Sequence, residues 1–266
     1  MDGVPAALAW WRSEPGGAAW LERLPRLVAE LADAWSLRIG AVLEGGNVAL
    51  VLDVERADGA AAVLKLNFPE PESEHEGDAL AVWGGDGAVR LLAQDRPRSA
   101  LLLERLEPAT RALALDDDAA TRAAAGVLRR LHREPPAAHP FRLLADEARR
   151  WARRDPAVAA TVADLLAGDA PAVLLHQDLH AANVLRAADG WRAIDPKPLV
   201  GDPAFDVASI VRDRRPVPGA RVTGRRLDLL HAELGYDRDR MRAWSYVHAV
   251  AWGHPAEARL LDPRRA

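Results

Sequence analysis

The stretch that decides the fold spans His176–Leu185 and reads HQDLHAANVL. Asp178 stands five residues before Asn183, and Asp195 directly follows the short apolar run Trp191–Ile194. An Asp carboxylate can accept the proton of a hydroxyl group. Amide and carboxylate oxygens are hard ligands of the kind that Mg²⁺ prefers. The spacing therefore predicts a loop that combines a proton acceptor with a magnesium site.

This order of residues is typical of a kinase catalytic loop, H-x-D-x-x-x-x-N, with a metal-binding Asp on the next strand. On that interpretation Asp178 accepts or orients the proton of the attacking hydroxyl, while Asn183 and Asp195 hold Mg²⁺ against the phosphates of ATP. Asp and Asn also cap turns, so Asp178 by itself supports either interpretation equally. The joint pattern between two short strands favours phosphoryl transfer.

A single lysine interrupts the apolar run Ala61–Leu66, which is expected to be a strand. Burying a lysine is costly unless it is paired. Kinases place a phosphate-binding lysine on their third strand and pair it with a Glu of the next helix. We therefore expect Lys65 to bind the nucleotide and to pair with Glu76, which begins a more convincing helical face than Glu72 or Glu74. The alternative is an edge-strand lysine that faces solvent.

Two weaker patterns concern the rest of a nucleotide site. Gly45 and Gly46 fall where a loop covering the phosphates would lie, but they do not complete a G-x-G-x-x-G motif, and an ordinary hairpin turn explains them equally well. The run Leu101–Leu106 resembles a strand that enters a hinge, where the backbone of Glu104 and Leu106 would bind the adenine edge. A plain core strand and turn is the alternative.

Hydrophobic periodicity divides the chain into a β-rich first part and a mainly helical second part. The expected strands are 39–43, 48–54, 61–66, 89–93 and 99–103, with short apolar runs at 172–175 and 191–194. The expected helices are 18–35, 74–83, 116–132, 156–168, 204–212, 224–234 and 238–252. This segregation predicts an α+β fold with an N-terminal lobe at 1–106 and a helical C-terminal lobe at 107–266, which carries the catalytic loop and the acceptor pocket. Clefts between lobes are favoured ligand sites.

Composition limits the classes to which the chain can belong. Its 266 residues, 49% of them hydrophobic, suffice for one large domain or two lobes. The absence of cysteine excludes disulfide scaffolds, thiolate zinc sites and cysteine nucleophiles. A net charge of −4 lacks the basic footprint of a nucleic-acid binder. Neither a secretory signal nor an apolar run of about 18 residues is found, so we expect a cytoplasmic protein with no membrane partner.

The chain resembles the aminoglycoside phosphotransferases, which share the protein-kinase-like fold, and most of all their streptomycin 6-phosphotransferase or hydroxyurea phosphotransferase branch. The matching stretches are 60–66, 83–92, 101–106, 174–180, 193–197 and 199–208. The resemblance implies a kinase that uses ATP and Mg²⁺ to phosphorylate a hydroxyl of an aminoglycoside-like, streptomycin-type or other polar small molecule, cationic or polyhydroxylated. It also implies carboxylates that bind substrate amines or guanidines, for which Glu233, Asp237 and Glu257 are candidates.

The same resemblance assigns roles within the loop region. It implies that Asp178 is the catalytic base, that the metal and lysine roles are those predicted from the motifs, and that Asp202 and Asp206 brace the loop. Gln177 and Pro198 stand where the family usually has Gly, so the backbone conformation there is in question.

Two other functions fit parts of the sequence. A nucleotide-binding pseudokinase or regulator would have the same fold, although the key side chains of an active kinase are all present. A metal-dependent hydrolase would use His176, Asp178 and His180 as ligands. No H-E-x-x-H motif supports the hydrolase, and it leaves Lys65 and Asn183 unexplained. A serine hydrolase lacks its G-x-S-x-G motif.

Overall fold

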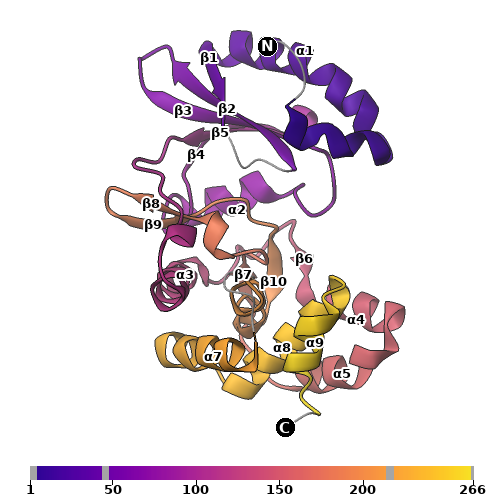
Figure 1. Ribbon diagram of the computed structural model, residues 1–266. Coiled ribbons are helices and arrows are strands. Elements are labelled where there is room, and N and C mark those ends of the chain that lie inside the picture. Colours follow the sequence, from indigo (N-terminus) through magenta and orange to yellow (C-terminus); the bar gives the residue numbers. More distant parts are fainter. Residues whose placement is uncertain (1–4, 44–47, 214–218, 265–266) are drawn as a thin grey trace. The chain divides into compact units, whose positions relative to one another are not determined.

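The computed structural model describes residues 5–43, 48–213 and 219–264 (Figure 1). The chain divides into two compact units. The first contains the residues up to Ala81 together with Val89–Arg105, and the second contains Val82–Ala88 together with the residues from Leu106 onward. These units differ from the expected lobes, 1–106 and 107–266, mainly in the segment Val82–Ala88.

The segment Val82–Ala88 folds with the second unit because its contacts are there. The indole of Trp83 is buried, and its Nε1–H donates to the carbonyl oxygen of Leu131 at 2.9 Å. The carbonyl oxygen of Gly87 accepts the backbone N–H of Ala193 at 2.8 Å. Contacts this far apart in sequence carry no local signal, which is why strand and helix patterns alone do not place the segment.

The first unit is built on an antiparallel sheet of five strands in the order β1-β2-β3-β5-β4. Its elements are η1 (Ala6–Ser13), α1 (Gly17–Trp35), β1 (Leu37–Val42), β2 (Ala49–Arg56), β3 (Ala61–Asn67), α2 (Glu76–Trp83), β4 (Leu91–Asp95), η2 (Arg96–Arg98) and β5 (Ala100–Glu104). The small antiparallel sheet expected from the sequence is confirmed, and β3 is its central strand.

The core of this unit lies between α1 and one face of the sheet. Apolar residues at helical spacing give α1 a buried stripe, and alternation along the strands gives the sheet a matching face. The buried stripe of α1 consists of Leu21, Leu24, Val28 and Leu31, and the strand residues in the same cluster include Leu50, Leu52, Leu64 and Leu66. The turn between β2 and β3 contains Gly59 at φ +80°, a left-handed conformation that glycine adopts at low cost.

The second unit is mainly helical and contains two small sheets, β6-β10-β7 and β8-β9. Its helices are η3 (Ala112–Ala114), α3 (Asp117–Leu131), α4 (Leu144–Arg154), η4 (Pro156–Val158), α5 (Ala159–Ala167), η5 (Ala181–Asn183), η6 (Pro203–Phe205), α6 (Ala208–Val211), α7 (Ala220–Leu234), α8 (Arg238–Ala251) and α9 (Pro255–Leu261). Its strands are β6 (Arg142–Leu143), β7 (Val173–Leu175), β8 (Val184–Ala187), β9 (Gly190–Ala193) and β10 (Leu199–Gly201).

The sequence patterns found most of these helices but missed α4 and α9. The signal for α4 was present, because its buried residues Leu144, Ala148 and Trp151 follow an i, i+4, i+7 spacing. The single helix expected at 204–212 is wrong in detail, since the chain there forms η6 and then the short helix α6. The turn η6 lies between Asp202 and Asp206, which cap its two ends.

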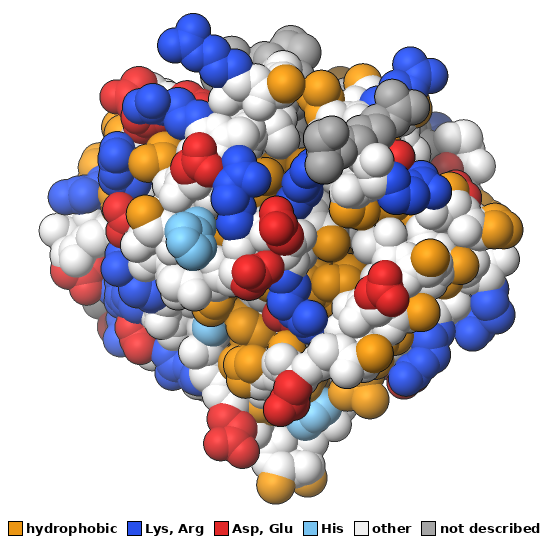
Figure 2. All heavy atoms as spheres, turned by 90° about the horizontal axis from the view of Figure 1, so that it is seen from below, with side chains coloured by type: hydrophobic (Ala, Val, Ile, Leu, Met, Phe, Trp, Pro, Cys, Tyr) orange, Lys and Arg blue, Asp and Glu red, His pale blue; other side chains and the backbone are white. Residues whose placement is uncertain are grey.

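Charged side chains of both signs are interspersed on the face shown in Figure 2, with no continuous field of either sign. Some charged side chains of opposite sign pair with each other in the described chain, such as Arg225 of α7 with Asp118 of α3. None of the described helices combines the length and the apolar character that a membrane span requires.

Leu64 on β3 tests the core of the first unit, because its side chain is 0% exposed. We expect Leu64→Ala to lower the free energy of unfolding by about 2–5 kcal/mol through lost burial and the cavity left behind. The matched control is Val42→Ala on the edge strand β1, where the side chain is 41% exposed and the expected change is within about 0.5 kcal/mol. Urea unfolding followed by tryptophan fluorescence measures both, and equal effects would contradict this description of the core.

Candidate active site

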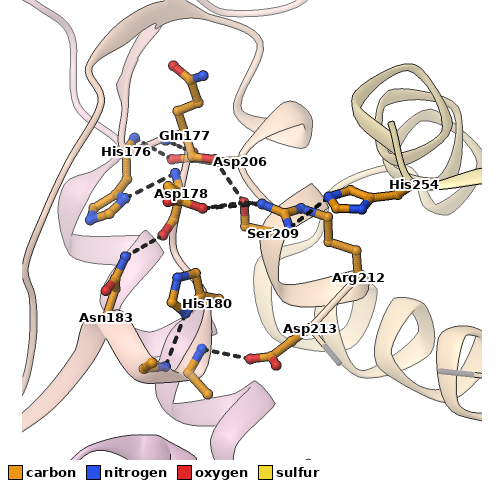
Figure 3. A network of polar contacts seen from close by, with 12 residues as sticks. His176, Gln177, Asp178, His180, Asn183, Asp206, Ser209, Arg212, Asp213 and His254 are labelled. Carbon is orange, nitrogen blue, oxygen red and sulfur yellow. Dashed lines mark hydrogen bonds and ion pairs between the residues drawn. The ribbon is translucent and has the colours of Figure 1, made fainter. Parts of the chain in front are cut away.

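The loop that begins at His176 is held by one buried carboxylate, that of Asp206. Its Oδ2 accepts the backbone N–H of His176 at 2.7 Å, and its Oδ1 accepts that of Gln177 at 2.5 Å (Figure 3). The side chain of Asp206 is 0% exposed. A carboxylate that receives two backbone N–H groups fixes the direction of the chain that bears them. Asp206 therefore braces the loop, as the sequence resemblance implied.

Further contacts follow Asp206 at intervals of three residues along the same segment. Ser209 Oγ donates to the carbonyl oxygen of Gln177 at 2.9 Å, and Arg212 donates to Asp178 Oδ1 at 3.2 Å. Residues three apart on a helical turn share a face. One face of the segment 206–212 therefore meets three consecutive residues of the loop in order.

Asp206 also contacts His132, which in turn contacts Tyr236. His132 Nε2 lies 3.0 Å from Asp206 Oδ2, and His132 Nδ1 lies 2.7 Å from the hydroxyl of Tyr236. Burial, with help from nearby Asp206, raises the pKa of Tyr236 to about 12, so the hydroxyl keeps its proton and can donate to Nδ1. Because a carboxylate can only accept, the Nε2–H of His132 donates to Asp206 Oδ2.

These contacts decide the ionisation of Asp206. Burial alone raises the pKa of its carboxyl, but the hydrogen bond from His132 and the backbone N–H of His176 outweigh burial. The pKa of Asp206 therefore lies below its ordinary value, and the group is a carboxylate at neutral pH.

The β8–β9 hairpin brings Asn183 and Asp195 to the same end of a two-stranded sheet. Val184 pairs with Ala193 in the ladder, and the N–H of Ile194 donates to the carbonyl oxygen of Asn183 at 3.0 Å. The residues that flank the hairpin are thus neighbours in the backbone, although they are twelve apart in sequence.

The donor set at this end of the hairpin fits a magnesium ion. The Nδ2 of Asn183 donates to the backbone carbonyl of Asp178 at 3.0 Å, which fixes the amide plane. Its Oδ1 accepts no hydrogen bond from any residue that the structure describes, so a hard oxygen is available there next to the chain that carries Asp195. An amide oxygen and a carboxylate are suitable ligands for Mg²⁺, which usually takes one or two protein ligands beside substrate phosphates and water.

Two residues of the site hold backbone conformations that are rare outside glycine. Gln177 has φ +71° and Asp195 has φ +59°. Such conformations cost about 1–3 kcal/mol each and are often found at functional sites. Gln177 therefore keeps the left-handed backbone that a glycine would adopt there, and its buried side chain receives a hydrogen bond from Arg142 at 3.4 Å.

His176 is a structural residue rather than a metal ligand. Its imidazole is 0% exposed, its Nε2 lies 3.0 Å from the carbonyl oxygen of Ile194, and its Nδ1 accepts the N–H of Asp178 at 3.3 Å. Burial holds the pKa of His176 below its ordinary range, so the ring is neutral. Both ring nitrogens are thus occupied within the protein.

The second histidine of the hydrolase alternative is also used locally, because His180 Nδ1 caps η5 through the N–H of Ala182. No group of three or more His, Cys, Asp or Glu side chains suited to a metal ion occurs among the described residues. The structure therefore gives the hydrolase interpretation no metal centre in the described chain.

In the first unit, Lys65 and Glu76 form a buried ion pair. Lys65 Nζ lies 2.7 Å from both carboxylate oxygens of Glu76, and the two side chains are 4% and 2% exposed. Asn67 Nδ2 donates to Glu76 Oε2 at 2.7 Å. Glu76, rather than Glu72 or Glu74, is the partner of Lys65 in this pair. The alternative of an edge lysine facing solvent is wrong, because β3 is the central strand.

The structure does not test the roles predicted for the glycine loop and for the adenine-binding hinge. Gly45 and Gly46 lie outside the described residues. Glu104 is the last residue of β5, and its Oε1 accepts the N–H of Arg90 at 2.8 Å. Leu106 is buried at the start of the second unit's main segment. The adenine-binding role of both residues stays a prediction.

Several carboxylates considered from the sequence serve other parts of the fold. Asp202 caps η6 and binds Arg240 and Trp244 of α8, each at 2.5 Å, so it braces α8 rather than the loop. Glu233 forms ion pairs with Arg122 and Arg129 of α3. Asp237 caps α8, and Glu257 is buried in α9. The ion pairs and the cap leave Glu233 and Asp237 poorly placed for a substrate cation.

Sequence reasoning missed Ser209 and Arg212. Asp206, Ser209 and Arg212 are spaced three residues apart, which places them on one face of a helical turn. The sequence alone does not show that this face contacts the loop.

Asp206→Asn tests the brace, because an asparagine would set an NH₂ group against one of the backbone N–H donors. We expect it to lower the free energy of unfolding at pH 7 by about 1–3 kcal/mol, because a buried backbone N–H donor loses its acceptor. Since the pKa of Asp206 is lowered in the folded state, its stabilisation is present above the ordinary value of about 4 and is lost as the pH falls below it. Denaturation at pH 7 and pH 3 should show the difference between parent and variant shrinking in acid. A difference that grows in acid would contradict the assignment.

Comparisons with known proteins bear directly on this geometry. The family model described as "Aminoglycoside/hydroxyurea antibiotic resistance kinase" matches residues 34–257. The chain is 41% identical to a streptomycin 6-kinase of Streptomyces glaucescens, over 93% of this chain and 88% of that protein. It is 40% identical to a hydroxyurea phosphotransferase of Kitasatospora aureofaciens, over 93% of this chain and 78% of that protein.

Solved structures agree on the fold. The choline kinase LicA from Streptococcus pneumoniae superposes with a TM-score of 0.64 at 14% identity, covering 89% of this chain and 91% of that one. A thermostable mutant of aminoglycoside phosphotransferase APH(4)-Ia, in a ternary complex with ADP and hygromycin B, gives a TM-score of 0.59 at 14% identity, covering 90% and 98%. The expected protein-kinase-like α+β fold is confirmed. Together with the match over residues 34–257, these findings establish that the chain belongs to the aminoglycoside/hydroxyurea antibiotic resistance kinases, small-molecule kinases that use a nucleotide.

Proposed function

We propose that this kinase transfers the γ-phosphoryl group of ATP to a hydroxyl of a streptomycin-type aminoglycoside, with Asp178 as the proton acceptor. The observation that supports the proposal is the hydrogen bonding of the two oxygens of the Asp178 carboxylate. Its Oδ1 receives Arg212, while its Oδ2 accepts no hydrogen bond from the residues that the structure describes. The side chain is 24% exposed, so a substrate hydroxyl can reach that oxygen.

One proton acceptor is enough for the proposed phosphoryl transfer. The substrate oxygen forms a bond to the γ-phosphorus, and the bond from that phosphorus to the β,γ-bridging oxygen breaks with its electron pair leaving on ADP. The proton of the attacking hydroxyl passes to Asp178 Oδ2. Because the transition state of phosphoryl transfer is loose, positioning and charge stabilisation are the main contributions expected from the protein.

Residues of each unit have proposed roles toward the nucleotide. Lys65 would bind the phosphates while Glu76 orients its ammonium group. Asn183 Oδ1 and the Asp195 carboxylate would hold Mg²⁺, which neutralises charge on the phosphate oxygens when bound. The backbone of Glu104 and Leu106 would bind adenine, and Gly45 and Gly46 would cover the phosphates.

Streptomycin is the acceptor that the similarities favour. The 41% identical relative is named a streptomycin 6-kinase, and coverage of 93% of this chain includes both units. A hydroxyurea phosphotransferase at 40% identity makes hydroxyurea the second acceptor to test. Both compounds are polar small molecules, and we place the reaction in the cytoplasm, where ATP is available.

Asp178→Asn is the direct test of the catalytic assignment. An asparagine keeps the shape of the side chain but cannot accept the proton, so kcat/KM for phosphorylation of streptomycin should fall by about 10²–10⁴-fold. Coupled measurement of ADP release, with mass spectrometry of the product, follows the reaction.

The matched control for that test is Asp228→Asn, an exposed aspartate of α7 that pairs with Arg238. It should leave kcat/KM unchanged. Wild-type turnover in Asp178→Asn would refute the role of Asp178. An active nucleotide-binding wild type that phosphorylates neither streptomycin nor hydroxyurea would refute the proposed acceptor class.

Lys65→Met tests the nucleotide site separately from the chemistry. A lost charge-assisted hydrogen bond of about 1.5–3 kcal/mol corresponds to a 10- to 150-fold weaker affinity. We expect that loss in calorimetric titration with a non-hydrolysable ATP analogue and MgCl₂. Arg38→Met, which removes a cation with a 74% exposed side chain on β1, is the control and should bind as the parent does. Equal affinity in all three proteins would exclude Lys65 from the site.

A further inference from the structure

Arg212 occupies a position that the proposed reaction does not by itself require. It follows α6 directly and caps it, with φ −87° and ψ −2°. Its NH2 group donates to Asp178 Oδ1 at 3.2 Å, and its NH1 group lies 3.4 Å from Nε2 of His254 (Figure 3). The guanidinium therefore lies between the proposed proton acceptor and the segment that begins α9.

The contact with Asp178 is made away from bulk solvent. The side chain of Arg212 is 18% exposed and that of Asp178 is 24% exposed. Ion pairs on open surfaces contribute little, because water screens them and both side chains lose freedom. A partly buried guanidinium with several partners is better fixed, and here it donates one N–H group to one oxygen of the carboxylate.

The contact with Arg212 makes the two carboxylate oxygens of Asp178 different. Oδ1 lies 3.2 Å from Arg212 and 3.5 Å from Ser209 Oγ, and neither contact involves Oδ2. At the other end of the residue, Asn183 holds the backbone carbonyl of Asp178 at 3.0 Å. With the main chain and one carboxylate oxygen both fixed, the direction of Oδ2 is determined.

The alternative is that Arg212 only joins elements of the fold. The loop already has other supports, since Asp206 receives the N–H groups of His176 and Gln177, and Ser209 donates to the Gln177 carbonyl. Asp206 and Ser209 both bond to the backbone of the loop, whereas the contact of Arg212 with the loop is made to the carboxylate of Asp178.

We propose that Arg212 is a positioning residue for phosphoryl transfer, which anchors Asp178 Oδ1 so that Oδ2 faces the acceptor hydroxyl. This inference rests on the proposed function of Asp178. Arg212 acts through Asp178 and takes no proton itself, since an arginine stays charged in proteins. Its removal should therefore slow the transfer step and leave nucleotide binding unchanged.

The test compares Arg212→Met, Arg212→Lys and Arg212→Gln with the parent. Misplacement of a reacting group costs up to about a hundredfold, so Arg212→Met should lower kcat about ten- to hundredfold while KM for ATP stays within about twofold. Arg212→Lys, which keeps the charge, should recover part of the loss. Arg212→Gln keeps an N–H donor without the charge and replaces the methionine variant if that protein does not fold.

Chemical rescue separates positioning from a structural role. Guanidinium chloride, at concentrations that leave the protein folded, should raise the kcat of Arg212→Met severalfold, and sodium chloride at equal ionic strength should not. It should not raise the rate of Asp178→Asn. Arg149→Met is the control, because Arg149 forms an exposed ion pair with Asp146 within α4, and its kcat should equal that of the parent.

The outcomes distinguish the inference from the proposed function. If Asp178→Asn is inactive while Arg212→Met keeps the parental kcat, only the inference fails. It also fails if the loss in Arg212→Met accompanies a lower melting temperature and neither lysine nor guanidinium restores activity. Full activity in Asp178→Asn overturns the proposed function and the inference together.

Discussion

The Asp206 carboxylate receives the backbone N–H groups of His176 and Gln177 inside the second unit, and the rest of the candidate site is arranged from that contact. A fully buried carboxylate is tolerable only when hydrogen bonds replace the water that it has lost. His132 also bonds to Asp206 Oδ2, and Tyr236 in turn bonds to His132. Because the brace fixes the loop at its first two residues, the position of Asp178 one residue later is set by the fold.

Side chains of the segment 206–213 contact successive residues of the loop and so fix its path. Asp206, Ser209 and Arg212 meet residues 176–178 in order, and Asp213 accepts the N–H of Ala181 at 2.9 Å farther along. The β8–β9 hairpin positions the two residues proposed to hold the metal, since its ladder places Asn183 beside the chain of Asp195. Catalytic geometry of this kind is held by regular elements and not by the loop alone.

How much the sequence predicts depends on the range of the contacts. The sheet, most helices and the pairing of Lys65 with Glu76 follow from periodicity and from the cost of a lone buried lysine, which are local arguments. The contact of Arg212 with Asp178 and that of Asp202 with Arg240 join residues more than thirty positions apart, so local sequence patterns do not identify the partners. The broken helix at 204–212 has a local cause, because Asp202 and Pro203 begin a 3₁₀ turn there. The periodicity hid this turn because its residues Ala204 and Phe205 are buried like those of a core helix.

A crystal structure of the chain with a non-hydrolysable ATP analogue and Mg²⁺ would show whether the braced loop and the hairpin form the metal site. We expect a metal ion at about 2.0–2.1 Å from Asn183 Oδ1 and from a carboxylate oxygen of Asp195. We also expect phosphate oxygens at Lys65, with the Asp206 contacts to the loop unchanged. A nucleotide bound without these residues, or a metal ion held elsewhere, would contradict these expectations.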